Sequence, residues 1–133
     1  MQVDRATIGF VEDSDDDFAL LSRVFSEAWN LHRWSTGESA AQAFTGPAPH
    51  AAGVEVLLVD HDLPGMDGVA VIEHVRACMG ANSPLVCMVS GTGRPGISES
   101  ALAAGADAFF AKPNSVSGLR ELAAAVAALA AAR

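Results

Sequence analysis

The chain has 133 residues, of which half are apolar and few are aromatic, and it carries a formal net charge of −8. This length suits one domain with a core built mainly from Val, Leu, Ile and Ala. The eight basic residues are scattered, which argues against partners such as nucleic acid or an anionic membrane surface. No apolar run has the length that spans a bilayer and the N-terminus lacks a secretion signal, so we expect a cytoplasmic protein.

Five short segments predict β-strands. Four of them are apolar on consecutive residues, which is typical of strands buried on both faces of a parallel sheet. The second in chain order is more polar and suits the edge of a sheet. The five segments are 8–11, 31–34, 54–59, 85–89 and 108–111.

The first helix is expected to begin near Ser14 or Asp15, because apolar residues recur on one helical face from Phe18 onward. We interpret Asp15, Asp16 and Asp17 as charges that complement the helix dipole at its start, and not as ligands.

Four more helices are predicted, at 38–44, around 69–75, at 95–104 and around 119–129. Gly105 is placed to cap the fourth of the five helices. The two cysteines, Cys78 and Cys87, lie in apolar segments and are expected to be buried hydrophobes. A disulfide framework would need more cysteines.

Strict alternation of five strands with five helices predicts an α/β fold with a parallel sheet and helices on both faces. Of the two common strand orders, five strands fit the doubly wound, flavodoxin-like order 2-1-3-4-5. Neither a repeat nor a second domain is visible, so residues 1–133 are expected to form a single domain.

Ligands in such sheets bind beyond the carboxyl ends of the strands, where the strand order reverses. That point lies between the first and third strands, which run out into Glu12 and Asp13 and into Asp60 and Asp62. Unpaired carboxylates would repel one another there, so a hard divalent cation, most simply Mg²⁺, is the expected counter-charge.

The fourth strand ends at Ser90 and the fifth at Lys112, which adds a hydroxyl and an ammonium to the same crevice. A transferring phosphoryl group requires this set. The cation and the ammonium offset its charge, the hydroxyl bonds an equatorial oxygen, and a carboxylate attacks in line. The four strand ends together predict a phosphoryl-transfer site.

In these features the chain resembles the receiver domain of bacterial two-component response regulators. The resemblance covers essentially the whole chain, in the right order and at the right spacing, and implies a CheY-like fold. The residues that carry it are Glu12-Asp13, the run from Leu57 to Asp60, the stretch Leu63-Pro64-Gly65-Met66-Asp67-Gly68, Ser90, and Lys112-Pro113.

The resemblance implies a role for each matched residue. Asp60 would be the phosphoacceptor, Ser90 the switch hydroxyl and Lys112 the phosphate partner, with a cis bond before Pro113. Phe109 takes the aromatic switch position, three residues before the lysine.

The resemblance also implies the ligands of a Mg²⁺ ion. Asp13 would bind it directly and Glu12 through water, whereas Asp60 would supply a side-chain oxygen and Asp62 its backbone carbonyl. Asp62 and Thr92 lie where side chains steer the hydrolytic water. The residues from Gly93 to Gly96 form a more flexible loop than the family usually has.

The function implied by the resemblance is that of a stand-alone receiver and not of an enzyme. A sensor histidine kinase or a histidine phosphotransfer protein would donate the phosphoryl group. The face made by the fourth helix, the fifth strand and the fifth helix would then change and signal to a downstream protein. The start from Glu12 to Phe18 resembles receivers paired with phytochrome-type kinases.

Other readings stay open. The Asp60-x-Asp62 pair also looks like the nucleophile motif of haloacid-dehalogenase-type phosphatases. That reading leaves Glu12 and Asp13 unexplained, and only Glu121 offers an acid after the lysine. A third reading is a phosphorylation-independent interaction module. The Ala-rich last helix is either a docking or homodimer face or an ordinary terminal helix.

Overall fold

The computed structural model describes residues 5–51, 53–91 and 95–133. Within these ranges, strands and helices alternate along the chain, as predicted. The elements are β1 Thr7–Val11, α1 Asp15–Phe25, β2 Asn30–Trp34, α2 Gly37–Ala43, β3 Val54–Asp60, α3 Gly68–Met79, the 3-10 turn Gly80–Asn82, β4 Leu85–Ser90, α4 Ile97–Ala104, β5 Ala108–Ala111 and α5 Val116–Ala131.

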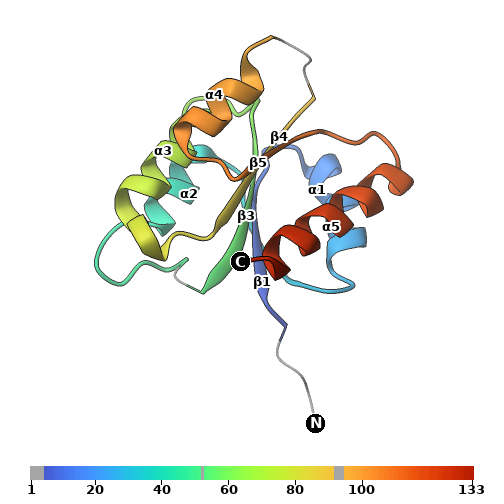
Figure 1. The fold of residues 1–133 in the computed structure, drawn as a ribbon, viewed down its shortest axis with the longest axis horizontal. Coiled ribbons are helices and arrows are strands. Elements are labelled where there is room, and N and C mark those ends of the chain that lie inside the picture. The colour runs from blue at the N-terminus through green and yellow to red at the C-terminus, as the bar shows by residue number, and fades with distance from the viewer. Residues whose placement is uncertain (1–4, 52, 92–94) are drawn as a thin grey trace.

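The described strands form one parallel sheet in the order β2-β1-β3-β4-β5, which confirms the predicted flavodoxin-like topology. The central strands β3 and β4 are buried along almost their whole length, whereas β2 at the edge is partly exposed. Helices α2, α3 and α4 cover one face of the sheet, and α1 and α5 cover the other (Figure 1).

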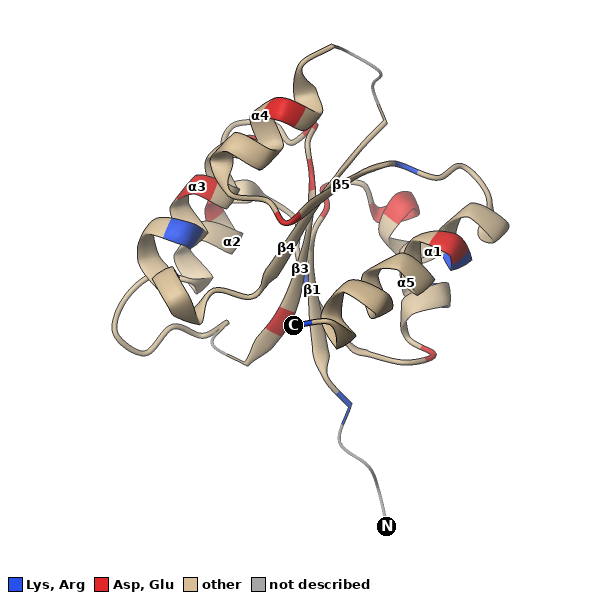
Figure 2. Ribbon diagram, in the orientation of Figure 1, with Lys and Arg blue, Asp and Glu red and all other residues tan. Residues whose placement is uncertain are grey.

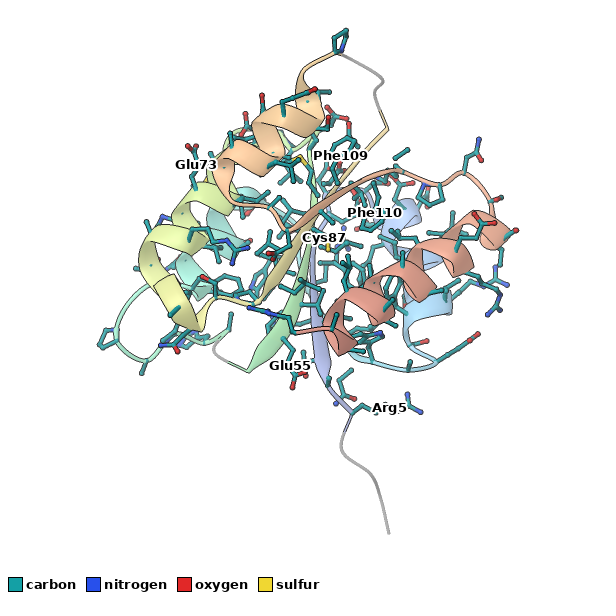
Figure 3. All side chains as sticks on the ribbon, viewed as in Figure 1. Arg5, Glu55, Glu73, Cys87, Phe109 and Phe110 are labelled. Carbon is teal, nitrogen blue, oxygen red and sulfur yellow. The ribbon has the colours of Figure 1, made fainter. Side chains whose placement is uncertain are left out.

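Each face of the sheet has its own hydrophobic cluster. The two phenylalanines of β5 illustrate the division, because successive side chains of a strand point to opposite faces. Phe109 packs with the cluster under α3 and α4, and Phe110 packs with the cluster under α1 and α5 (Figure 3). β5 therefore contacts both halves of the core.

Local signals explain where the helices around the sheet begin and end. Ser14 caps α1 by accepting a hydrogen bond from the amide of Asp17, and Asp67 caps α3 in the same way through Ala70. Gly105 follows α4 with φ +114°, a conformation that favours glycine, as predicted. α4 begins at Ile97, two residues later than predicted.

Two sequence-based expectations are wrong. Cys87 is buried, but Cys78 is exposed because it lies on the outer side of the last turn of α3. The bond before Pro113 is trans, since the described residues contain no cis peptide; the trans form is the commoner one for proline. In the part of the chain that the structure describes, no helix has the length and apolar character to cross a membrane.

The close approach of α3 to the end of β3 makes Gly68 sensitive to substitution. A Cβ at this position would lie 2.5 Å from the carbonyl oxygen of Asp60 and 2.9 Å from Cε of Met88. We expect Gly68→Ala to lower the free energy of unfolding by about 1–3 kcal/mol, the usual cost of overpacking, as measured by urea unfolding.

Gly53→Ala is the matched control, because its Cβ would meet nothing within 4 Å. Equal stabilities for the two variants would contradict the close packing of α3 on β3.

Candidate phosphoryl-transfer and metal site

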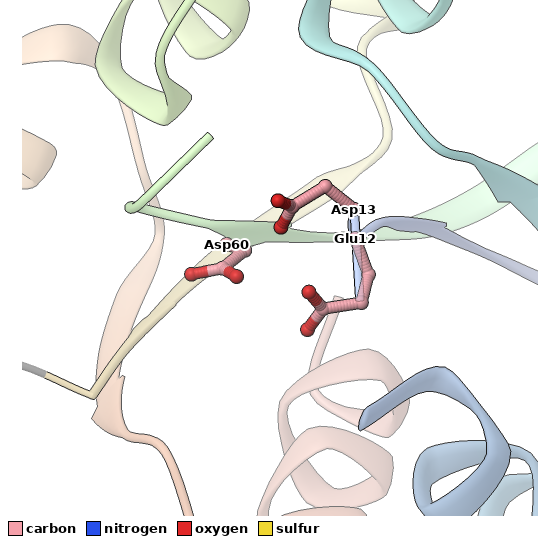
Figure 4. A group of neighbouring side chains, drawn as sticks. All are labelled: Glu12, Asp13 and Asp60. Carbon is pink, nitrogen blue, oxygen red and sulfur yellow. The ribbon is translucent and has the colours of Figure 1, made fainter. Parts of the chain in front are cut away.

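Three carboxylates meet at the carboxyl ends of the parallel strands. Glu12 and Asp13 follow directly after β1, and Asp60 is the last residue of β3. An oxygen of each lies within 4.8 Å of an oxygen of the others (Figure 4). Glu12 and Asp60 are 2% and 4% exposed, whereas Asp13 is exposed.

The strand pairing explains this convergence. β1 and β3 are neighbours in a parallel register in which Val11 pairs with Val59, so the residues that follow them emerge side by side. This is the point where the strand order reverses, as predicted. Acidic residues gather near this end of the central strands and on the facing first turn of α1 (Figure 2).

The ammonium of Lys112 lies against this cluster. Its Nζ is 2.6 Å from Glu12 Oε1 and 3.1 Å from Asp60 Oδ2. Lys112 directly follows β5, and its amide donates a hydrogen bond of 2.8 Å to the carbonyl of Ser90 at the end of β4. The side chain therefore reaches the acidic cluster from the far side of β4.

Burial and charge perturb the ionisation of both partners. Burial raises the pKa of Glu12 to about 7; the charge of Asp60 adds to this, and the hydrogen bond from Lys112 opposes it. For Lys112, burial lowers the pKa, but hydrogen bonds to Asp17 and Glu12 and the charge of Asp60 outweigh it. The pKa of Lys112 is therefore raised, and it stays protonated at neutral pH.

Asp17 is the residue that sequence reasoning missed. Its Oδ2 lies 2.8 Å from Nζ of Lys112, so it is more than a helix-start charge. The signal was present, because α1 begins directly after Glu12 and Asp13, and its first turn must pass close to the strand ends. Only the fold shows which of the three consecutive aspartates faces the lysine.

The predicted switch residues lie on β4 and β5. Ser90 ends β4 and is 3% exposed. Phe109 pairs with Met88 in the β4–β5 register, two residues before Ser90, and is partly buried against the cluster under α4. The neighbours of Ser90 that lie in its loop, Thr92, Gly93 and Arg94, fall outside the described residues.

The backbone of Asp62 contacts the side chain of Asp60. Its amide donates a hydrogen bond of 3.1 Å to Oδ1 of Asp60, and its carboxylate lies 3.0 Å from Nδ1 of His61. The hydrogen bond from the Asp62 amide fixes the turn that follows β3 and orients the Asp60 carboxylate.

The donor set suits Mg²⁺. Glu12, Asp13 and Asp60 offer only carboxylate oxygens, which hard cations prefer. Within the described ranges, they are the only group of three or more His, Cys, Asp or Glu side chains close enough to share an ion. The two buried members now share the Lys112 ammonium, which indicates that this crevice favours positive charge.

Residues 8–124 match the response regulator receiver domain family. The chain belongs to this family. Receiver domains are signalling phosphoacceptors, which typically take a phosphoryl group on an aspartate and bind Mg²⁺ in their acidic pocket. A search of curated proteins finds no significant match.

Solved structures share the fold across the chain. The phosphorylated cyanobacterial phytochrome response regulator RcpA has a TM-score of 0.78 at 17% identity, covering 92% of this chain and 91% of its own. A CheY-like receiver from Methanospirillum hungatei JF-1 has a TM-score of 0.76 at 20% identity, covering 96% of this chain and 97% of its own. A chain of the CheX–CheY–BeF3–Mg²⁺ complex from Borrelia burgdorferi has a TM-score of 0.75 at 24% identity, covering 90% of this chain and 87% of its own.

The raised pKa of Glu12 predicts a pH-dependent stability for the metal-free protein. The unfolded chain releases this proton near its ordinary pKa of 4.5, whereas the folded protein holds it up to about pH 7. The free energy of unfolding should therefore fall as pH rises through this window. We expect urea unfolding in a chelating buffer to show this slope.

Glu12→Gln cannot titrate at this position, so its stability should vary less between pH 4.5 and 7. Identical pH profiles for the two proteins would mean that Lys112 keeps Glu12 ionised throughout.

Proposed function

We propose that the chain accepts a phosphoryl group on Asp60, with Mg²⁺ in the acidic crevice, from a sensor histidine kinase or a histidine phosphotransfer protein. The observation that carries the proposal is the setting of Asp60. Its carboxylate is buried at a strand end, 3.1 Å from the Lys112 ammonium and within 4.8 Å of the carboxylates of Glu12 and Asp13.

In the transfer step, a side-chain oxygen of Asp60 attacks phosphorus in line. The new bond forms as the bond to the leaving nitrogen of the phosphohistidine breaks, and the electron pair stays on that nitrogen. Lys112 offsets charge on the phosphoryl oxygens, and the Ser90 hydroxyl donates to one of them in the product.

Asp13, the Asp60 carboxylate and the backbone carbonyl of Asp62 would hold the Mg²⁺ ion directly, and Glu12 would hold it through water. When bound, the ion neutralises charge on the carboxylates and on the phosphoryl oxygens. The donor set and the crowding of the three carboxylates support this assignment.

The acyl phosphate would draw Ser90 toward it and let Phe109 follow, which changes the surface made by α4, β5 and α5. The position of Phe109, partly buried under α4, supports this route. The signal would pass to a downstream protein, because the net charge of −8 opposes a nucleic-acid partner. The stretch from Glu12 to Phe18 supports a phytochrome-type kinase as the donor.

A haloacid-dehalogenase-type phosphatase would use the same Asp60 as its nucleophile. The ion pair between Glu12 and Lys112 argues against a phosphatase, because the phosphatase mechanism gives Glu12 no role. Turnover of added phosphomonoesters would favour the phosphatase. A phosphorylation-independent module would have no use for a buried Asp60 beside a lysine.

We expect one phosphoryl group per chain after incubation with acetyl phosphate and Mg²⁺, read as intact mass. Asp60→Asn should abolish the added mass, because an amide cannot act as the nucleophile. Omitting Mg²⁺ should also prevent it. The control is Glu55→Gln, which changes an exposed carboxylate near the amino end of β3 (Figure 3).

An added mass that survives Asp60→Asn would contradict the assignment of the phosphoacceptor. A wild-type protein that gains no mass and releases no phosphate from the donor would overturn the proposed function.

Mg²⁺ binding should depend on Asp13. Asp13→Asn removes the charge of one member of the acidic cluster, and we expect the dissociation constant for Mg²⁺ to rise roughly tenfold or more. Isothermal titration calorimetry measures this dissociation constant directly. Equal affinities for Asp13→Asn and the Glu55→Gln control would place the ion elsewhere.

A further inference from the structure

Three carboxylates surround the ammonium of Lys112, and each comes from a different element. Glu12 follows β1, Asp17 lies in the first turn of α1, and Asp60 ends β3, at Nζ distances of 2.6, 2.8 and 3.1 Å. An ammonium has three donors, so three acceptors satisfy it. The lysine is thus held in one place by contacts from three directions.

The three acceptors differ in what else they do. Glu12 and Asp60 also belong to the group of carboxylates that is close enough to share a metal ion. Asp17 does not belong to that group. With a cation in the crevice and a phosphoryl group on Asp60, Glu12 and Asp60 would have other partners, and Asp17 would be the contact that Lys112 retains.

We propose that Asp17 is a positioning residue that holds the Lys112 ammonium against the phosphoryl group during transfer. This inference rests on the proposed function, since it assigns Lys112 to that reaction. The lysine side chain has four rotatable bonds, so an anchor that restricts it before the reaction raises the fraction of molecules that are ready to react.

The backbone gives this anchor a fixed base. The amide of Asp17 donates to Oγ of Ser14, the N-cap of α1, at 3.2 Å. The carboxylate is 44% exposed and the lysine 20%, so water and salt screen the contact in part. The expected effect on the rate is therefore moderate, and it should weaken as the salt concentration rises.

The test measures the rate at which acetyl phosphate phosphorylates Asp60 at saturating Mg²⁺. Asp17→Asn should slow the reaction about three- to tenfold, while the dissociation constant for Mg²⁺ stays within about twofold of wild type. Asp17→Glu should restore most of the rate, because it returns the negative charge. Asp16→Asn is the matched control, since it removes an exposed charge from the same turn and should leave the rate unchanged.

A double-mutant cycle separates positioning from a general effect on folding. In a Lys112→Met background, Asp17→Asn should cause no further loss of rate, because the residue acts through Lys112. An equal loss in both backgrounds would overturn the inference.

The outcomes also separate this inference from the function beneath it. A wild-type protein that takes up no phosphoryl group overturns both. If the wild-type protein is phosphorylated and the Asp17→Asn variant reacts at the same rate or faster, the role of Asp17 is overturned and the proposed function stands.

Discussion

The attraction between one partly buried ammonium, that of Lys112, and the carboxylates around it is the interaction on which the site depends. Parallel pairing of β1 with β3 forces Glu12 and Asp60 together at the reversal of the strand order, where burial removes most of their hydration. Two buried carboxylates without a counter-charge would be costly. Lys112 supplies that charge, and the raised pKa of Glu12 shows that burial still outweighs the pairing with Lys112 at that carboxylate.

The same contact joins the site to the part of the fold that would transmit a change. Lys112 directly follows β5, and β5 carries Phe109 on one face and Phe110 on the other. The amide of Lys112 also donates a hydrogen bond to the carbonyl of Ser90, which joins the ends of β4 and β5. A new group on Asp60 would compete for Lys112 and act on both strands at once.

Much of this arrangement could be predicted from the sequence because it follows from periodicity and from strand ends. Consecutive apolar residues in β3 and β4 predict buried parallel strands, and the residues after them predict the site. Three results could not be predicted. They are the ion pair between Asp17 and Lys112, the exposure of Cys78 and the trans bond before Pro113. Each depends on how the elements pack against one another, which the local sequence does not specify.

The central claim is that Asp60 itself carries the phosphoryl group. The most direct measurement is reduction of the phosphorylated protein with borohydride, which converts an aspartyl phosphate to homoserine, followed by sequencing of the peptides by mass spectrometry. The account predicts homoserine at position 60 and unchanged aspartate at positions 13, 17 and 62. Homoserine at another aspartate, or a phosphoryl group found on His61, would contradict it.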